Sequence, residues 1–300
     1  MRFSASSFIT LLAAVGAVSA QPAKRARSIN PVGQNARVDL TALPPVDVTP
    51  NTNAKRFAQG LPPLNAVKRH PHRGGPHRDG GYSHKGTPVG LAPRAEASPA
   101  PATNFKCNIL VQTTAGSTLG YISPVFNDYG EYGILQSSQA GALGVSFPNT
   151  GPVDFLTTNG VDAINSFPYL SAALGFMSNG DDLGPGLTNY ITITGNSGST
   201  GSGSTPASST SNSYATRTGK AANSETAIWT YNPATQAIRI VWTNTDGSSV
   251  PTKLAYFIDE DTTDGDSNTL VATGDMAAFQ GSFGCTDTCP EITFTCVPPA

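Results

Sequence analysis

Histidine is absent from residues 101–300 of this 300-residue chain, because all four histidines lie before position 85. That absence excludes a Ser-His-Asp or Cys-His catalytic group within the region, together with the usual histidine-bearing zinc and copper sites. The chain has only four cysteines and two tryptophans. Beyond its N-terminus no stretch approaches about 18 continuous apolar residues, so we expect no membrane-spanning helix.

The first twenty residues, MRFSASSFITLLAAVGAVSA, have the pattern of a secretory signal peptide. Arg2 gives a short basic start, and the apolar run at 8–18 is too short to cross a bilayer as a helix. Small residues precede the cut that we expect after Ala20. The sequence therefore predicts a secreted, extracellular protein without a membrane partner.

Charge divides the chain into two parts. Residues 1–100 carry 13 Lys and Arg against 4 Asp and Glu, whereas residues 101–300 carry 5 against 16. The span 21–103 is rich in Pro, Gly, Ala and basic residues and has no sustained helical or strand period. Such a composition does not bury enough apolar surface to offset the entropy of ordering. We predict a disordered basic linker or pro-segment at 21–103 and a folded domain at 104–300.

Three dibasic pairs in this segment end at Arg25, Arg56 and Arg69. Pairs of this kind are processing sites in a fungal-type secretory route, and we predict a secreted form that begins at or after Arg56 or Arg69. Chance pairing in a basic segment is the alternative. The positive charge would attract an acidic polysaccharide or a nucleic acid. Secretion makes nucleic acid a poor partner, so we expect none.

Residues 104–300 alternate short β-rich runs with Gly, Asn, Asp and Pro, which is typical of an antiparallel sandwich or barrel. We predict an all-β domain, and specifically an antiparallel β-sandwich of the jelly-roll or lectin-like kind in preference to a closed barrel. One helical turn is expected at 275–279, and a mobile, exposed Gly/Ser/Thr loop at 195–213. The expected strands are 105–112, 118–123, 132–136, 143–147, 153–157, 169–177, 188–194, 226–231, 237–243, 252–258, 268–272 and 291–297.

The four cysteines allow three disulfide pairings. Side-chain alternation places Cys107 and Cys296 on the inward faces of strands at the two ends of the domain. We therefore predict a Cys107–Cys296 disulfide that ties these ends together and a Cys285–Cys289 disulfide that closes a small loop. A zinc site made of four thiolates is the rival, disfavoured by the oxidising compartment and by the lack of paired C-x-x-C spacings.

The densest acidic stretch offers candidate ligands for a calcium ion. Its aspartates are Asp259, Asp261, Asp264 and Asp266. Carboxylate oxygens are ligands that calcium prefers, but the spacing does not fit an EF-hand loop. A solvated acidic turn is the favoured interpretation, so calcium is the single cofactor candidate and otherwise none is expected.

Carboxylates also remain as candidate catalytic groups. A glycoside hydrolase needs two of them, about 5 Å or 6.5–9.5 Å apart. Glu131, Asp154 and Glu225 lie in or beside expected strands. Surface carboxylates without a catalytic role are the favoured interpretation, so no catalytic residue is assigned.

Both tryptophans lie in the stretch AIWTYNPATQAIRIVW, residues 227–242. Its NPAT segment suits a type I turn, and a hairpin closed there would pair Trp229 with Ile238 and Tyr231 with Gln236. Alternation then puts both tryptophans on one face with Tyr231, Ile238 and Ile240. This apolar face favours core tryptophans. The alternative is that Trp242 and Tyr231 lie at its rim and stack on sugar rings, which suits aromatic side chains.

Five short segments occur in a characteristic order: NAKRFAQGLPP at 53–63, LGYIS at 119–123, EYG at 131–133, AIWTYNP at 227–233 and WTNTDG at 242–247. In these the chain resembles a group of uncharacterised secreted proteins of mushroom-forming fungi. The resemblance implies secretion and a shared β-domain, and it implies no activity.

These features together favour a secreted, non-enzymatic β-sandwich protein that binds cell-wall or plant polysaccharide. A glycoside hydrolase or lyase that uses carboxylates is one alternative. An extracellular structural or interaction protein, with a basic arm and an acidic body, is the other.

Overall fold

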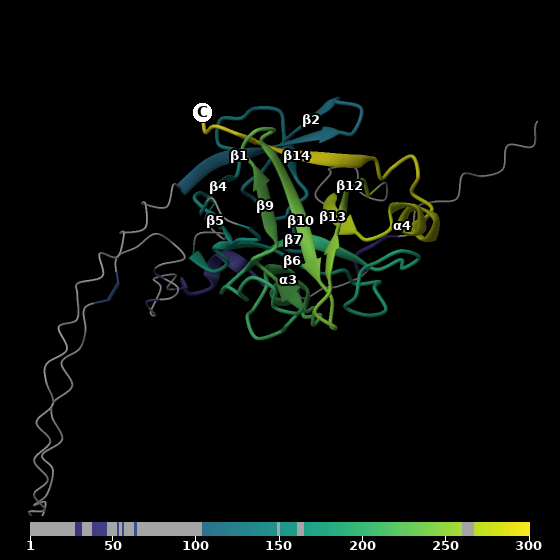
Figure 1. The fold of residues 1–300 in the computed structure, drawn as a ribbon, viewed down its shortest axis with the longest axis horizontal. Helices are drawn as coiled ribbons and strands as arrows, with labels where there is room; N and C mark the ends of the chain where they lie inside the picture. Colours follow the sequence, from purple (N-terminus) through teal and green to yellow (C-terminus); the bar gives the residue numbers. More distant parts are fainter. Residues whose placement is uncertain are drawn as a thin grey trace, which may run out of the picture.

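The computed structural model describes residues 28–31, 38–46, 53, 56, 63–64, 104–148, 151–160, 165–259 and 267–300. Strands make up most of the regular secondary structure in the described part of the domain, and all of their pairs are antiparallel (Figure 1). The first strands are β1 (Asn104–Thr113), β2 (Thr118–Ile122), β3 (Leu135–Gln136), β4 (Gly144–Pro148), β5 (Phe155–Thr157), β6 (Tyr169–Leu174) and β7 (Tyr190–Asn196). The others are β8 (Ser224–Glu225), β9 (Trp229–Asn232), β10 (Ala237–Thr243), β11 (Ser249–Pro251), β12 (Lys253–Phe257), β13 (Thr269–Thr273) and β14 (Glu291–Val297).

Eight of these strands pair into a closed ring. Its order is β1–β14–β12–β13–β7–β6–β5–β4, and β4 pairs with β1 again. The prediction of a mostly antiparallel β-domain is confirmed. The preference for a jelly-roll or lectin-like sandwich is not: the ring reads as an eight-stranded barrel. Short alternating strands suit both architectures, and only the pairing of β1 with β14 closes the ring.

The hairpin of β9 and β10 branches from the ring at β14 and crosses the front of the molecule in Figure 1. Its register is Ile238 opposite Tyr231 and Ile240 opposite Trp229, two residues away from the predicted pairing. The turn is longer than expected, because it includes Gln236 with a φ of 58° in the left-handed region. A slip of two residues keeps every side chain on its face. The predicted grouping of the aromatic residues therefore holds despite the wrong register.

Apolar side chains form two main clusters, one inside the ring and one outside it. The inner cluster includes Ile109, Phe155, Ala172, Ile193, Trp229 and Trp242. The outer cluster consists of Ile29, Tyr190, Ala255, Phe257, Val271, Met276, Phe279, Phe283, Cys285 and Cys289. β7 is buried along its entire length because both of its faces are covered, even though isoleucine and threonine alternate along it.

Two helices cover the outer face of the ring. α4 (Met276–Phe283) begins at its N-cap Asp275, whose side chain accepts a hydrogen bond from Ala278 N, and it packs Phe279 and Phe283 against Tyr190. The helical turn predicted at 275–279 is thus confirmed and extends further. α3 (Ser213–Thr218) was not predicted, because it follows the Gly/Ser/Thr-rich stretch directly. Its signal is Asn212, which caps the helix by accepting from Ala215 N.

Both predicted disulfides are present. Cys107–Cys296 joins β1 and β14, with Cα atoms 5.4 Å apart, where the ring closes. Cys285–Cys289 closes a five-residue loop after α4, with Cα atoms 5.3 Å apart. No helix among the described residues is long and apolar enough to cross a membrane.

Two stretches of the basic N-terminal segment pack against the barrel. Residues 28–31 bury Ile29 in the outer cluster, and residues 38–46 bury Leu40, which begins the short 3-10 helix η1 (Leu40–Ala42). We call these two stretches together the N-terminal strap; they are the purple parts of Figure 1 that lie against the domain. The composition of 21–103 predicted disorder throughout, and it missed these two anchors because each depends on a few apolar residues.

Candidate functional site

The predicted aromatic face lies mostly inside the protein. Trp229 stacks on Phe155 at a ring separation of 5.3 Å, and Phe155 stacks on Phe147 at 3.9 Å. Tyr231 packs edge-on against Phe147 at 5.2 Å and contacts Phe105 at 5.0 Å. Four strands therefore contribute to one continuous aromatic column.

Trp242 does not lie at a rim. It is 0% exposed, and its indole Nε1 donates a hydrogen bond to the Asp181 carbonyl at 2.8 Å. Trp229 is equally buried and donates to the Leu170 carbonyl at 2.7 Å. The core interpretation is confirmed for both tryptophans, and the predicted position of Trp242 at a rim is wrong. Tyr231 remains half-buried, at the end of the column.

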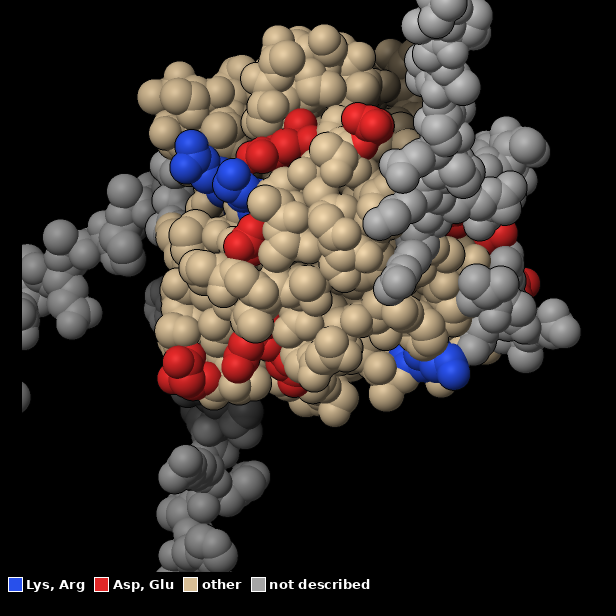
Figure 2. Space-filling view, turned by 90° about the vertical axis from the view of Figure 1, so that its right-hand side faces the viewer, with Lys and Arg blue, Asp and Glu red and all other residues tan. Residues whose placement is uncertain are grey.

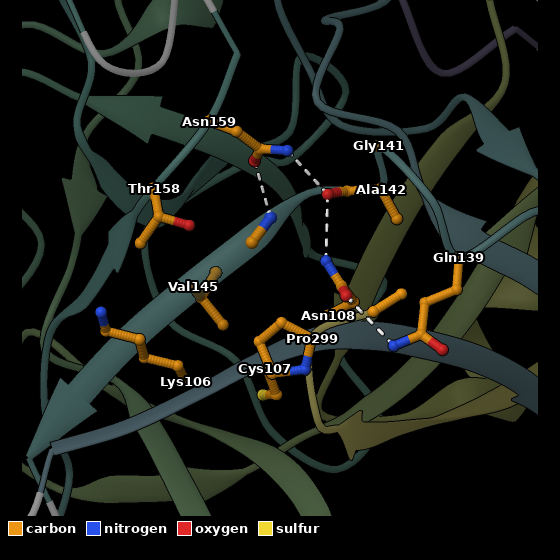
Figure 3. A pocket seen from close by; sticks show the side chains of 12 residues that line it. Lys106, Cys107, Asn108, Gln139, Gly141, Ala142, Val145, Thr158, Asn159 and Pro299 are labelled. Carbon is orange, nitrogen blue, oxygen red and sulfur yellow. Dashed lines mark hydrogen bonds between the residues drawn. The ribbon is translucent and has the colours of Figure 1, made fainter.

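A pocket lies elsewhere, where β1 pairs with β4 (Figure 3). It has a volume of about 290 Å³ and a lining of mixed polar and apolar character, whose polar side chains are Lys106, Asn108, Gln139, Thr158 and Asn159. Small-molecule sites usually occupy about 300–1,000 Å³. At about 290 Å³ this pocket lies just below that range, so it has room for a small ligand only.

Two asparagines hold the walls of this pocket. Asn108 Nδ2 donates to the carbonyls of Ala142 and Leu143 at 3.0 and 3.2 Å. Asn159 accepts from Gly144 N at 2.7 Å and donates to the Ala142 carbonyl at 2.8 Å (Figure 3). Because these amides link β1, β4 and the loop before β4, the pocket is built before any ligand arrives.

The side-chain amide of Gln139 and a close contact between Thr158 and Gly144 complete the lining. Gln139 Nε2 donates to Asn108 Oδ1 at 3.2 Å and also to the carbonyl of Pro298. Gly144 has no side chain, and a Cβ there would collide with Thr158 Oγ1. The hydroxyl of Thr158 can therefore approach the strand backbone only because position 144 is glycine.

Lys106 gives this pocket a cationic group in an otherwise acidic domain. Residues 101–300 contain only five Lys and Arg, and Lys106 is exposed on β1. Figure 2 shows one face of the molecule on which acidic side chains stand in several separate places, with basic side chains and much uncharged surface between them. An anionic group on a ligand in this pocket would therefore be attracted to the ammonium group of Lys106.

Glu225 is a buried carboxylate that faces the inside of the ring. On β8 it pairs with Ala172, a member of the inner cluster. Both carboxylate oxygens accept from a single donor, Thr243 N, at 3.2 Å. Burial raises the pKa of Glu225 to about 8, and the hydrogen bonds from Thr243 only partly oppose that rise.

Glu131 is a second buried carboxylate with different surroundings. Its Oε2 accepts hydrogen bonds from Thr269 Oγ1 at 2.6 Å, from Asn127 Nδ2 at 3.0 Å and from Asn30 Nδ2 of the N-terminal strap at 3.0 Å. Burial raises the pKa of Glu131, against the lowering effect of these bonds. The pKa of the Glu131 carboxyl therefore also lies above its usual range.

The two glutamates point to opposite faces of the sheet. Glu131 bridges Thr194, which pairs with Ser171, whereas Glu225 pairs with the next residue of β6, Ala172. Directly paired residues share a face and successive residues alternate. These carboxylates therefore do not face each other across a substrate, as the pair of a glycosidase does. Asp154, the third candidate, accepts a 2.6 Å hydrogen bond from Ser199 Oγ.

The calcium candidates lie largely outside the described residues. Asp261, Asp264 and Asp266 fall there, and Asp259 is buried with its backbone N–H bonded to Asn268 Oδ1. In the described part of the chain no group of His, Cys, Asp and Glu is placed to hold a metal ion. Ala20, Arg25 and Arg69 also lie outside the described residues, and Arg56 is half-buried.

Sequence reasoning missed the pocket residues. Asn108 follows Cys107 in β1 and so points away from the inner cluster, and an asparagine in a strand is a weak signal for a buried amide. Gln139 and Asn159 stand in stretches that read as ordinary loops. No protein-family model, curated protein or solved structure matches the chain.

Proposed function

We propose that this protein is a secreted, non-catalytic β-barrel protein that binds carbohydrate through the pocket at Lys106. The observation that carries the proposal is the lining of that pocket, to which one lysine, three side-chain amides and one hydroxyl contribute. Sugar hydroxyls are recognised by such groups, and a lysine adds attraction for a carboxylate. The ligand class that fits best is an acidic sugar unit of a cell-wall or plant polysaccharide.

The volume and the fixed walls set the length of the ligand. A space of about 290 Å³ suits one or two sugar units rather than a long stretch of polymer. Secretion is part of the proposal and is supported by the apolar N-terminal run and by the two disulfides, which persist in oxidising compartments. The glycosidase alternative is disfavoured because Glu131 and Glu225 lie on opposite faces of the sheet.

Binding to defined oligosaccharides tests this proposal. We expect isothermal titration to detect oligogalacturonate and to give a weaker response with neutral galactose oligomers. Lys106→Ala should weaken oligogalacturonate binding at least tenfold, whereas Lys220→Ala, which removes a lysine near α3, should leave binding unchanged. Salt should weaken binding to the wild-type protein, because the lysine is exposed.

Two outcomes would reject the proposal. One is that neither these oligomers nor insoluble chitin, β-glucan or cellulose retains the protein. The other is release of reducing sugar from any of these polymers, which would favour the glycosidase alternative.

A further inference from the structure

The N-terminal strap contacts the barrel as a ligand contacts a receptor. Residues 47–103 separate it from β1, so it reaches the barrel from a distant part of the chain. Its stretch 28–31 lies against the outer cluster, and its stretch 38–46 lies near α3. Three different kinds of contact hold the first stretch. They involve an aliphatic side chain, the peptide backbone and an amide side chain.

The first contact reads an aliphatic side chain. Ile29 is 1% exposed and belongs to the outer cluster with Tyr190, Phe279 and Phe283. The rings of Phe279 and Phe283 pack against Tyr190 at 5.3 Å each. The pocket for Ile29 is therefore built by α4 and β7, and only its occupant comes from the strap.

The second contact reads the peptide backbone. Tyr190 Oη donates to the Ile29 carbonyl at 2.7 Å, and the same hydroxyl accepts from Met177 N at 3.3 Å. Gly175 has no side chain, and a Cβ there would collide with the Tyr190 ring. The tyrosine that meets the strap is thus fixed by its own loop.

The third contact reads an amide side chain. Asn30 Nδ2 donates to Glu131 Oε2 at 3.0 Å and approaches Thr269 Oγ1 at 3.5 Å. A Cβ at Gly133 would overlap the Asn268 carbonyl oxygen, so glycine there lets the Glu131 segment lie against β13. The buried Asn30 Oδ1 has no hydrogen-bond partner among the described residues. The site therefore still has a buried hydrogen-bond acceptor without a donor when the strap is bound.

We propose that this face of the barrel is a peptide-binding site, which takes an extended segment with a branched aliphatic residue followed by asparagine and which the N-terminal strap occupies in cis. The second stretch adds anchors: Arg217 Nη1 donates to the Val38 carbonyl at 2.8 Å, and Val46 N donates to the Asn165 carbonyl at 2.5 Å. Dibasic pairs stand on both sides of the strap, at 24–25 and 55–56. A cut at these pairs turns the strap into a separate peptide, which then exchanges with others of its kind. This site is independent of the pocket at Lys106.

The test uses the full chain and a labelled synthetic peptide with the sequence of residues 28–46. We expect the intact wild-type chain to bind the peptide weakly, because its own strap occupies the site. A full-length variant with Ile29→Asp, Asn30→Ala and Leu40→Asp should bind the same peptide at least tenfold more tightly in fluorescence anisotropy. Near-ultraviolet circular dichroism, which reports on the two interior tryptophans, shows whether this variant keeps its core.

Peptide variants give the specificity. An Asn30→Asp peptide, which brings a second carboxylate to Glu131, should bind at least tenfold more weakly than the native peptide, and an Asp39→Asn peptide should bind equally well. If the triple variant does not fold, wild-type chain cut at 55–56 replaces it, and the labelled peptide should exchange with the cleaved strap. Equal binding to the intact wild type and the folded triple variant, no binding to that variant, or no exchange in the cut chain would each overturn the proposal.

Discussion

Glu225 and Glu131 are both buried, yet they are held in different ways. Glu225 lies inside the ring and receives one backbone donor, Thr243 N. Glu131 lies outside the ring and receives three side-chain donors, one of them from the N-terminal strap. The inner cluster is enclosed mainly by the strands of the ring, with Leu40 of the strap packed into it, whereas the outside is covered by helices and by residues 28–31. A carboxylate on the outer face can therefore be uncovered without opening the barrel.

The two disulfides should give the largest difference in stability between the inside and the outside of the ring. Cys107–Cys296 borders the inner cluster and spans 189 residues of sequence, while Cys285–Cys289 lies in the outer cluster and spans four. In the chain-entropy model the first stabilises by about 5 kcal/mol and the second by about 2 kcal/mol. We expect a Cys107→Ser, Cys296→Ser variant to lose far more stability in urea than a Cys285→Ser, Cys289→Ser variant. Equal losses would contradict the view that the seam of the ring is the more critical link.

The pH dependence of stability should also differ between the two buried glutamates. The pKa of Glu225 is raised from an ordinary 4.5 to about 8, so between these values the folded state holds a proton that the unfolded state has released. The free energy of unfolding should then fall as pH rises through this window, by up to about 5 kcal/mol in total. Glu225→Gln should flatten most of that fall, and the residual slope belongs to Glu131, whose pKa is also raised.

A matched control for this prediction is Glu291→Gln, which changes a carboxylate that pairs with Lys253 at the surface. Urea melts between pH 5 and pH 9 measure how the free energy of unfolding changes with pH in the wild type, in Glu225→Gln and in Glu291→Gln. A wild-type protein that gains stability as pH rises through the window would contradict the burial of an uncharged Glu225.

Truncating the aromatic column tests how tightly the inside is packed. Trp229→Ala and Trp242→Ala should each cost about 3–5 kcal/mol, because both rings are fully buried and both indole N–H groups are hydrogen-bonded. Tyr231→Ala should cost less, because Tyr231 is half-buried at the end of the column. Denaturant melts give all three values. A mild loss for Trp242→Ala would contradict the tight packing of this ring in the core.

The sequence predicted what depends on local alternation. Cys107 and Cys296 were paired correctly because their neighbours alternate polar and apolar, and β10 and β14 have the predicted bounds. Alternation does not say which strands meet. The closed ring depends on β1 joining β14 across most of the domain, and no local pattern carries that information.

The functional residues were harder to predict for the same reason. Trp242 and Tyr231 share a face, as predicted, but whether a face is a rim or a core depends on what covers it. Asn108, Gln139 and Asn159 come from three separate segments and meet only in the fold. Asn30 lies 101 positions from Glu131. Its role could not be read from a segment whose composition indicates disorder.

The Cys107–Cys296 disulfide has a consequence for proteolysis as well as for stability. Any single cut between these two residues leaves both pieces covalently joined, because the bond links β1 to β14. A nicked barrel therefore migrates as one band on a non-reducing gel and separates into two bands after reduction. A cut at the dibasic pairs, in contrast, lies outside this loop and leaves the N-terminal strap attached by noncovalent contacts alone. One covalent link thus divides the chain into a part that survives cleavage as a unit and a part that cleavage sets free to exchange.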